Sequence, residues 1–274
     1  MVVVVGIFGS LIGSFLNVVV YRVPRRMSVV APPSACPSCG THITARDNVP
    51  VLSWLFLRGK CRTCAAAISA RYPLVELGTA LFFAVVALVF VPPLFVATDG
   101  QQIAADALIL VAYLYLAAIS VALALIDFDT HTLPNRIVLP GYPVLAVLFT
   151  ASAALGGAWD ALLGAGVGLL IVGGTYLLLG LIAPRGMGGG DVKLSGVIGM
   201  ALGWLGWGPL IVGSLSAFIL GGLFGLALIL LRKADRTSGI PFGPWMLLGA
   251  WIGILAGEPL WNGYLAIFGL AGTL

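Results

Sequence analysis

Charged residues are scarce in this sequence. Asp, Glu, Lys and Arg together make up 9% of the 274 residues, whereas hydrophobic residues make up 60%. A chain of this composition, with a mean hydropathy of +1.11, cannot keep its apolar residues inside one water-soluble core. The composition therefore excludes a water-soluble enzyme and predicts an all-α polytopic membrane protein.

Long apolar runs locate the membrane-spanning segments. About 20 helical residues cross the ~30 Å hydrocarbon core of a bilayer. The sequence predicts about eight transmembrane helices, and the last run is long enough to contain a break. These runs lie near residues 2–20, 73–95, 103–126, 137–156, 159–183, 192–207, 208–231 and 242–272.

Lys and Arg are missing from every second connection between these runs. All 14 of them lie in or beside the connections at 21–72, 127–136, 184–193 and 232–241. The remaining connections carry acidic residues instead: Asp99, Asp106, Asp160 and Glu258. By the positive-inside rule, the basic connections face the cytoplasm and the N-terminus lies outside.

The first run has no basic residue before it and is followed at once by Arg22, so we expect a membrane anchor and not a cleaved signal peptide. The net charge of +4 then reflects membrane orientation and contact with membrane lipid. We expect no nucleic-acid partner. The resulting division is a first transmembrane helix at 1–20, a cytoplasmic four-cysteine loop at 21–72 and a transmembrane core at 73–274.

The only four cysteines all lie in the 21–72 loop, in two C-x-x-C pairs, Cys36 with Cys39 and Cys61 with Cys64. This spacing is typical of a four-thiolate, zinc-ribbon-like site. Disulfides would need an oxidising compartment, and a thioredoxin-like pair would need a surrounding βαβ pattern. Four protein ligands leave no open position, so we expect structural zinc, with His42 as a spare candidate ligand.

The two histidines lie in no motif that pairs them with a Ser or Cys nucleophile, so the sequence offers no catalytic triad. The segment from Gly188 to Asp191 is no phosphate-binding loop either, because Lys-Ser/Thr does not follow it. What remains as candidate chemistry is a small set of aspartates near the inner membrane face.

Asp127 and Asp129 lie at the inner end of the third run, and Asp191 lies at the inner start of the sixth. An Asp at the centre of a membrane helix costs about 2.5–3.5 kcal/mol, so their placement calls for a reason. Aspartic proteolysis needs two carboxylates that share one proton. Gly188 and Gly190 before Asp191 would let the backbone pass close to a bound peptide.

The residues alone leave alternatives open. Asp191 is also explained as the N-cap of its helix, and Asp127 as a loop acid or as a proton carrier of a transporter. If the turn is helical, Asp127 and Asp129 point to nearly opposite sides, and only one of them can meet Asp191. A zinc-ribbon membrane scaffold without chemistry is a further alternative.

Several motifs nonetheless resemble one known family, the type IV prepilin leader peptidases, which are membrane enzymes of the GxGD aspartic peptidase group. The resemblance spans residues 13 to about 245. It is carried by Gly13–Asn17 with Tyr21-Arg22, both cysteine pairs, Asn48–Pro50, Leu57–Arg62, Ile68-Ser69 with Tyr72-Pro73 and Glu76, Ile126-Asp127 with Leu133–Asn135, Gly188–Asp191 with Lys193-Leu194, and Ile240–Pro244.

The resemblance implies a multi-pass enzyme of the bacterial cytoplasmic (inner) membrane that cleaves the short leader of prepilins or pseudopilins on the cytoplasmic side. It assigns catalysis to Asp127 and Asp191 and leaves Asp129 as a neighbour. It also implies N-methylation of the new N-terminal residue from S-adenosylmethionine, which rests on the resemblance alone. The alternatives it leaves are a peptidase without methylation and a proton-coupled transporter. Presenilin-like cleavage would need a Pro-Ala-Leu motif where this chain has Ile240–Pro244.

Overall fold

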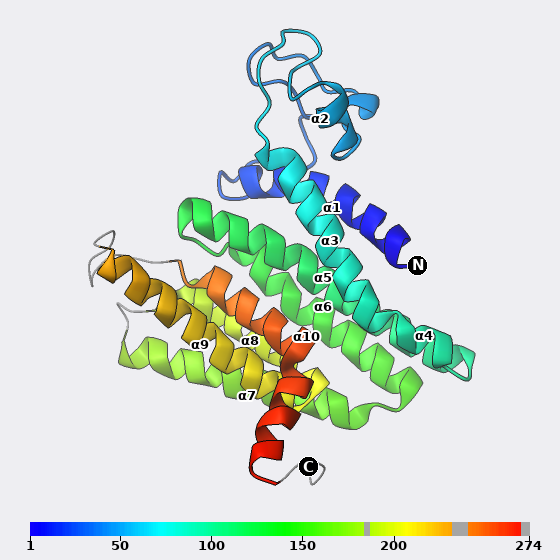
Figure 1. Ribbon diagram of the computed structural model, residues 1–274, viewed down its shortest axis with the longest axis vertical. Helices are drawn as coiled ribbons and strands as arrows, with labels where there is room; N and C mark the ends of the chain where they lie inside the picture. The colour runs from blue at the N-terminus through cyan, green and yellow to red at the C-terminus, as the bar shows by residue number, and fades with distance from the viewer. Residues whose placement is uncertain (184–186, 232–240, 270–274) are drawn as a thin grey trace. The chain divides into compact units, whose positions relative to one another are not determined.

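The structure is a computed structural model, and it describes residues 1–183, 187–231 and 241–269. Helices make up most of these residues, and the only β-pairing among them is two isolated bridges in the cysteine loop. Figure 1 shows the long helices in chain order. Parts of several predictions lie outside the described residues: most of the 232–241 loop, Ile240 of the last motif, and the end of the 242–272 run.

The chain divides into two compact units. The first contains residues Met1–Val96 and Tyr113–Ala122, and the second contains Ala97–Ala112 and Leu123–Leu274. One helix, α5 (Gly100–Thr130), contributes to both units.

The first unit is built on two long helices with the cysteine loop between them. Its elements are α1 (Val2–Arg22), η1 (Ala45–Asp47), α2 (Leu52–Phe56), α3 (Arg71–Phe90) and α4 (Pro92–Val96). Helices α1 and α3 run side by side (Figure 1). Two glycines let these helices approach closely. A Cβ on Gly9 would lie 2.7 Å from the Cβ of Phe83, and one on Gly13 would lie 2.8 Å from the Cα of Glu76.

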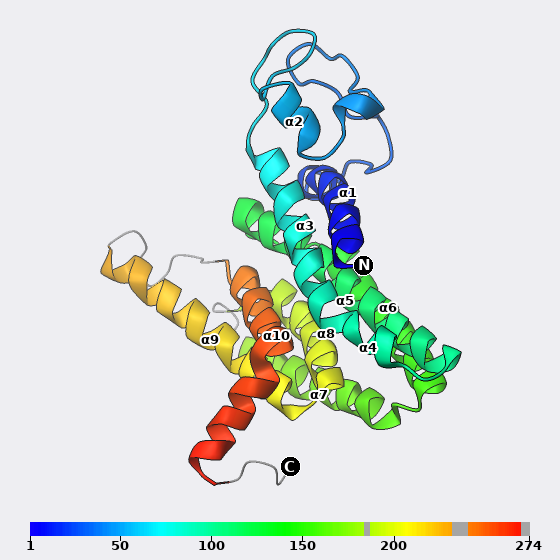
Figure 2. The same ribbon diagram turned by 45° about the vertical axis from the view of Figure 1, so that its right-hand side comes forward.

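The second unit is a helix bundle made of the remaining parts of α5 together with α6 (Asn135–Gly156), α7 (Trp159–Ile182), α8 (Gly189–Leu205), α9 (Trp207–Leu230) and α10 (Gly243–Ile267). Helix α7 packs along α8, and α9 packs along α10 (Figure 2). Helix α6 also contacts α8. This arrangement buries every residue of α8 from Leu194 to Trp204.

The fold confirms the all-helical prediction but not the predicted count of eight membrane spans. Six of the described helices are long and apolar enough to cross a bilayer: α1, α3 with α4, α5, α6, α7 and α9. Helix α8 has only 17 residues. The last predicted run forms one helix, α10, which continues through Pro259 without a break in the described residues.

Both ends of α5 are defined by local capping. The Asp99 side chain accepts a hydrogen bond from the backbone N–H of Gln102 at 2.8 Å and caps the start. At the other end His131 adopts a left-handed conformation with φ of 52°, and its N–H donates to the carbonyl of Asp127. Asp127 therefore lies in the last helical turn, and α5 ends three residues later at Thr130.

Glycines let α7 and α8 touch backbone to backbone. Gly164 and Gly168 of α7 face Gly203 and Gly199 on α8, and a Cβ on Gly168 would collide with the carbonyl oxygen of Gly199. This contact fixes the distance between the two helices.

We expect Gly168→Ala to lower the free energy of unfolding by about 1–3 kcal/mol, because the new methyl group overpacks the interface between α7 and α8. Gly166→Ala is the matched control, since no heavy atom lies within 4 Å of its Cβ position. Thermal unfolding in detergent compares the two variants. Equal transition temperatures would contradict the tight contact.

Candidate active site and metal centre

Asp127 is a buried carboxylate at the end of α5. Only 4% of the residue is exposed to solvent. Its Oδ2 accepts a hydrogen bond from the backbone N–H of Gly243, the first residue of α10, at 3.1 Å. The N-terminus of α10 thus supplies a donor to a carboxylate that burial would otherwise leave unsatisfied.

Asp191 lies in the first turn of α8, and the backbone N–H of Gly188 donates to its Oδ2 at 3.2 Å. The N-cap residue of α8 is Gly188, and Asp191 is the third residue of the helix. The alternative that Asp191 is the N-cap is therefore wrong. A carboxylate in the first helical turn is favoured by the helix dipole.

The two aspartates belong to the same unit and lie close enough for the charge of Asp127 to act on Asp191. Leu133 contacts both Gly190, which precedes Asp191, and Gly243, which donates a hydrogen bond to Asp127. A Cβ on Gly190 would come within 2.8 Å of Leu133 Cβ, and one on Gly243 would come within 3.1 Å of Leu133 Cδ2. The turn after α5 therefore contacts both the residue before Asp191 and the residue that binds Asp127.

Asp129 differs from Asp127 in its surroundings. The helix continues through both residues to Thr130, so their side chains leave it in different directions. Asp127 is buried, whereas Asp129 is exposed. Of the two, Asp127 is the one that shares a site with Asp191.

Two hydrogen bonds connect α6 to the start of α8. The Tyr142 hydroxyl of α6 donates to the carbonyl of Lys193 at 2.6 Å, and the Lys193 ammonium donates to Asn135 Oδ1 at 3.1 Å. A tyrosine in an apolar helix gives no sequence signal of such a role, whereas Asn135 and Lys193 already stood in recognised motifs.

The geometry limits the charge that this site can carry. Asp127 is buried, and Asp191 lies within range of its charge. Burial and a nearby like charge both disfavour the ionised form of a carboxylate.

The four cysteines form a second site in the first unit. Their Sγ atoms all lie within 4.8 Å of one another, and Cys36 Sγ lies 3.8 Å from Cys64 Sγ. A tetrahedral site with Zn–S bonds of about 2.3 Å has edges of about 3.8 Å between its sulfur atoms. The cluster therefore has the dimensions to hold one metal ion. The spare candidate His42 is not among the clustered ligands in the described residues.

The two cysteine pairs have the same backbone turn. In the first, Cys36 N–H donates to Thr41 O, and Gly40 N–H donates to Cys36 O. In the second, Cys61 N–H donates to Ala66 O, and Ala65 N–H donates to Cys61 O. Each turn ends in the left-handed region, with φ of 71° at Gly40 and 56° at Ala65.

Local hydrogen bonds favour the thiolate form at Cys39 and Cys61 but not at Cys64. A hydrogen bond with the backbone of Ala66 lowers the pKa of the Cys64 thiol, but hydrogen bonding with the Cys39 side chain and burial outweigh it and raise that pKa to about 11. Hydrogen bonds with the side chain and the backbone of Thr41 lower the pKa of the Cys39 thiol to about 6. Backbone N–H groups of Cys64 and Thr63 lower the pKa of Cys61. Thiolates are the form in which cysteine ligates zinc.

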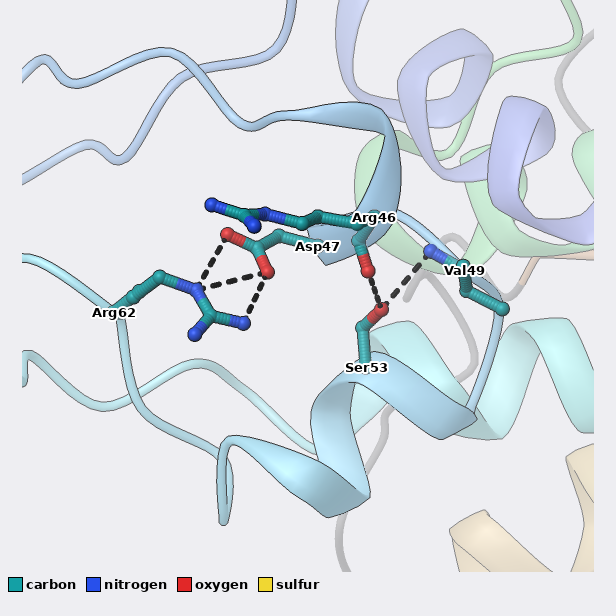
Figure 3. Close-up of polar contacts among 5 residues, drawn as sticks. All are labelled: Arg46, Asp47, Val49, Ser53 and Arg62. Atoms are coloured by element: carbon teal, nitrogen blue, oxygen red, sulfur yellow. Dashed lines mark hydrogen bonds and ion pairs between the residues drawn. The ribbon is translucent and has the colours of Figure 1, made fainter.

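An ion pair ties the second cysteine pair to the segment between the pairs. Arg62 Nη2 lies 2.6 Å from Asp47 Oδ1, and Arg62 Nε donates to Oδ2 at 2.9 Å (Figure 3). This interaction lowers the pKa of the Asp47 carboxyl. Close by, the Ser53 hydroxyl donates to Arg46 O and accepts from Val49 N–H, which joins η1 to α2 (Figure 3).

Comparison with known proteins gives two family matches. Residues 7–90 match the bacterial peptidase A24 N-terminal domain, and residues 114–230 match the type IV leader peptidase family. A protein of Aeromonas salmonicida named prepilin leader peptidase/N-methyltransferase is 38% identical over 95% of this chain and 92% of its own length. The chain belongs to the type IV leader peptidase family.

Two further members with the same name are close in length to this chain. The Aeromonas hydrophila protein is 37% identical and the Pseudomonas aeruginosa protein 36% identical, each over 96% of this chain and 93% of its own length. No solved structure gave a significant match. The leader peptidase match covers both Asp127 and Asp191, whereas the N-terminal match covers the four cysteines.

We expect Ala65→Gly to stabilise the cysteine loop by about 0.5–1 kcal/mol, because Gly adopts the left-handed conformation without the Cβ penalty that Ala65 has. Ala66→Gly is the control, since Ala66 does not have a positive φ. Denaturant titrations of the metal-loaded protein, followed by release of the metal, compare the two. The same shift in both variants would contradict the strain at Ala65.

Proposed function

We propose that this chain is a membrane aspartic peptidase that cleaves the short leader of type IV prepilins or pseudopilins, with Asp127 and Asp191 as its catalytic pair. The observation that carries this proposal is that two aspartates from distant parts of the sequence lie within electrostatic range of each other in one bundle, Asp127 being almost fully buried. Family membership and the names of the relatives support the substrate class.

Both aspartates accept backbone hydrogen bonds through Oδ2. Among the described residues, the Oδ1 atom of neither one has a hydrogen-bond partner in the protein. These two oxygens are therefore available to a water molecule and to the carbonyl group of a bound peptide. Gly188 and Gly190 would lie beside that peptide and leave room for its backbone.

The reaction follows from one shared proton. The ionised aspartate takes a proton from water, and the resulting hydroxide adds to the scissile carbonyl carbon. The protonated aspartate meanwhile donates its proton to the carbonyl oxygen. When the C–N bond breaks, the leaving nitrogen takes the proton that the first carboxylate had received. The pair ends the cycle with one proton, as it began.

N-methylation of the new N-terminal residue is the second activity in this proposal. It is supported by the names of the relatives, which are described as both peptidase and N-methyltransferase. S-adenosylmethionine would supply an activated methyl group when bound. The alternatives of a peptidase without methylation and of a proton-coupled transporter are less well supported, because neither agrees with those names.

The active site is proposed to face the cytoplasm of a bacterium. If the arginines that follow α1 face the cytoplasm, the N-terminus lies outside. Eight crossings, which count α8 and α10 with the six helices that are long and apolar enough, then keep the other basic connections inside. The cysteine loop at 21–72, Asp127 and Asp191 then share the inner side of the membrane. The distribution of Lys and Arg supports this orientation.

The cysteine cluster is proposed to hold a structural zinc ion. All four thiolates would be used as ligands, so no position would remain for a substrate. The loop at 21–72 has little apolar core of its own, and metal binding would supply folding free energy in its place.

We expect Asp127→Asn and Asp191→Asn each to reduce prepilin cleavage by more than about 100-fold, because an amide cannot exchange the proton that general acid–base catalysis transfers. The double variant should lose little more than either single one, since the pair acts as a unit. Cleavage rates of purified protein in detergent, measured by mass spectrometry of a prepilin, give the answer.

Asp129→Asn is the matched control for that experiment. Its carboxylate is exposed, and the change should cost less than about tenfold in rate. An inactive Asp129→Asn variant beside an active Asp127→Asn variant would reverse the assignment. Normal cleavage by all three would rule out the aspartic mechanism.

Elemental analysis of the purified protein is expected to find one zinc ion per chain, bound by Cys36, Cys39, Cys61 and Cys64. Any single Cys→Ser change removes one of four ligands and should reduce the zinc content, whereas His42→Ala should not. Zinc near zero in the unaltered protein, or a loss of zinc in His42→Ala equal to that in Cys→Ser, would disprove the site.

A further inference from the structure

A cavity of about 320 Å³ lies in the first unit, where α1 meets the cysteine loop. One wall is a single face of α1, which presents Ser14, Phe15 and Arg22 among its lining residues. The other wall is formed by loop residues from Val29 to Ser34 and by Asn48 with Pro50. Its size lies within the range of about 300–1,000 Å³ that is usual for small-molecule sites.

Hydrogen bonds from Arg22 hold the first part of the loop wall. Its Nη1 donates to Ser28 O at 2.9 Å, and its Nη2 donates to Pro32 O at 2.7 Å. Two of the five N–H groups of the guanidinium are used in this way. The positive charge of Arg22 therefore lies at the cavity while its side chain is fixed in place.

The cysteine site holds the next part of the wall. Ser34 lines the cavity two residues before Cys36, and its carbonyl accepts a hydrogen bond from Ile43 N–H at 2.9 Å. The turn of the first cysteine pair thus continues directly into the cavity wall. A metal ion at the cysteines would keep this wall in position.

Glu76 holds the third part. Its side chain is buried, with 9% of the residue exposed, and its Oε2 accepts a hydrogen bond from Val51 N–H at 2.7 Å. Val51 has φ of 62°, and Leu52 N–H donates to Pro50 O across it, so this is a tight turn of sparsely populated conformation. Pro50 lines the cavity, and Glu76 therefore positions that wall.

We propose that this cavity binds the methyl donor, an adenosyl sulfonium compound. The inference rests on the proposed methyltransferase activity. A half-exposed Phe15 offers a face to a flat base, Ser14 and Asn48 offer hydrogen-bonding groups to a ribose, and Arg22 offers a positive charge to a carboxylate. The donor is water-soluble and charged, so its site must open toward the cytoplasm, as the loop wall does in the proposed topology.

The second cavity found in the described residues does not meet this requirement. It is lined by Asp160, Trp204 and Trp207 at the start of α7 and the end of α8. Asp191 lies at the opposite end of α8. That cavity would therefore face the outer side of the membrane.

In the transfer step, the nitrogen of the new N-terminal amine forms a bond to the methyl carbon of the donor. The bond between that carbon and the positive sulfur breaks, and its electron pair stays on sulfur, which becomes a neutral thioether. The amine loses one proton to water. No oxidant, reductant or metal takes part, so a binding cavity with fixed walls is sufficient for the protein's contribution.

The test uses the full-length protein in lipid nanodiscs and radiolabelled S-adenosylmethionine as the probe. Ser14→Leu fills the cavity, and Ser10→Leu is the matched control one turn away on the same helix, outside the lining. We expect Ser14→Leu to weaken binding of the probe by about tenfold or more and Ser10→Leu to leave it unchanged. Methylation of a pre-cleaved pilin, relative to cleavage of a prepilin by the same preparation, should fall by a similar factor in Ser14→Leu.

Asn48→Ala, which lies in the loop and not in a helix, supplies the same test should Ser14→Leu fail to fold. Unchanged affinity for S-adenosylmethionine in the folded variants would overturn the proposal. So would loss of a bound anionic phospholipid from Ser14→Leu with unchanged affinity for the probe, because the cavity would then be a lipid site. An unaltered protein that neither binds the probe nor methylates would instead refute the methyltransferase activity itself.

Discussion

Two carboxylates that lie within range of each other in an apolar bundle are expensive, and most of the features at this end of the second unit reduce that cost. The free N–H groups at the starts of α10 and α8 bind the two aspartates through Gly243 and Gly188. In the proposed mechanism the pair shares one proton, which would remove one of the two charges. Both backbone hydrogen bonds use Oδ2, so the proposed contacts with water and with a peptide carbonyl would use Oδ1.

The cysteine loop is stabilised by other interactions than the helix bundle. A short polar segment between two membrane helices cannot bury enough apolar surface to fold alone. Here four sulfur atoms, the Asp47–Arg62 ion pair and the packing of Trp54 against Gly59 take the place of a core. Hydrogen bonds connect the loop to both neighbouring helices. Arg22 at the end of α1 donates to Pro32 O, and Glu76 of α3 accepts from Val51 N–H.

Much of this could be predicted from the sequence, because the signals are local. Apolar runs predicted the helices, and the two C-x-x-C pairs predicted the cluster. Helical geometry showed that only one of Asp127 and Asp129 can meet Asp191, and the family resemblance chose Asp127. Contacts between distant segments left no such signal: Gly243 is 116 residues from the Asp127 that it binds, and Tyr142 looks like an ordinary position of an apolar helix. The three glycines before Asp191 give no sequence signal of where the helix begins, so an N-cap role for Asp191 was a reasonable prediction. In the structure, however, α8 begins at Gly189.

The glycine contact between α7 and α8 also sets the position of Asp191 along the axis of the bundle. Gly164 and Gly168 on one helix and Gly199 and Gly203 on the other are each four residues apart, so the two surfaces fit in one register or in another that is displaced by a whole repeat. Such a displacement would move α8 by about 6 Å along its axis. Asp191, in the first turn of α8, would then lie at a different level from Asp127, so the small residues of this helix contact decide whether the two carboxylates meet.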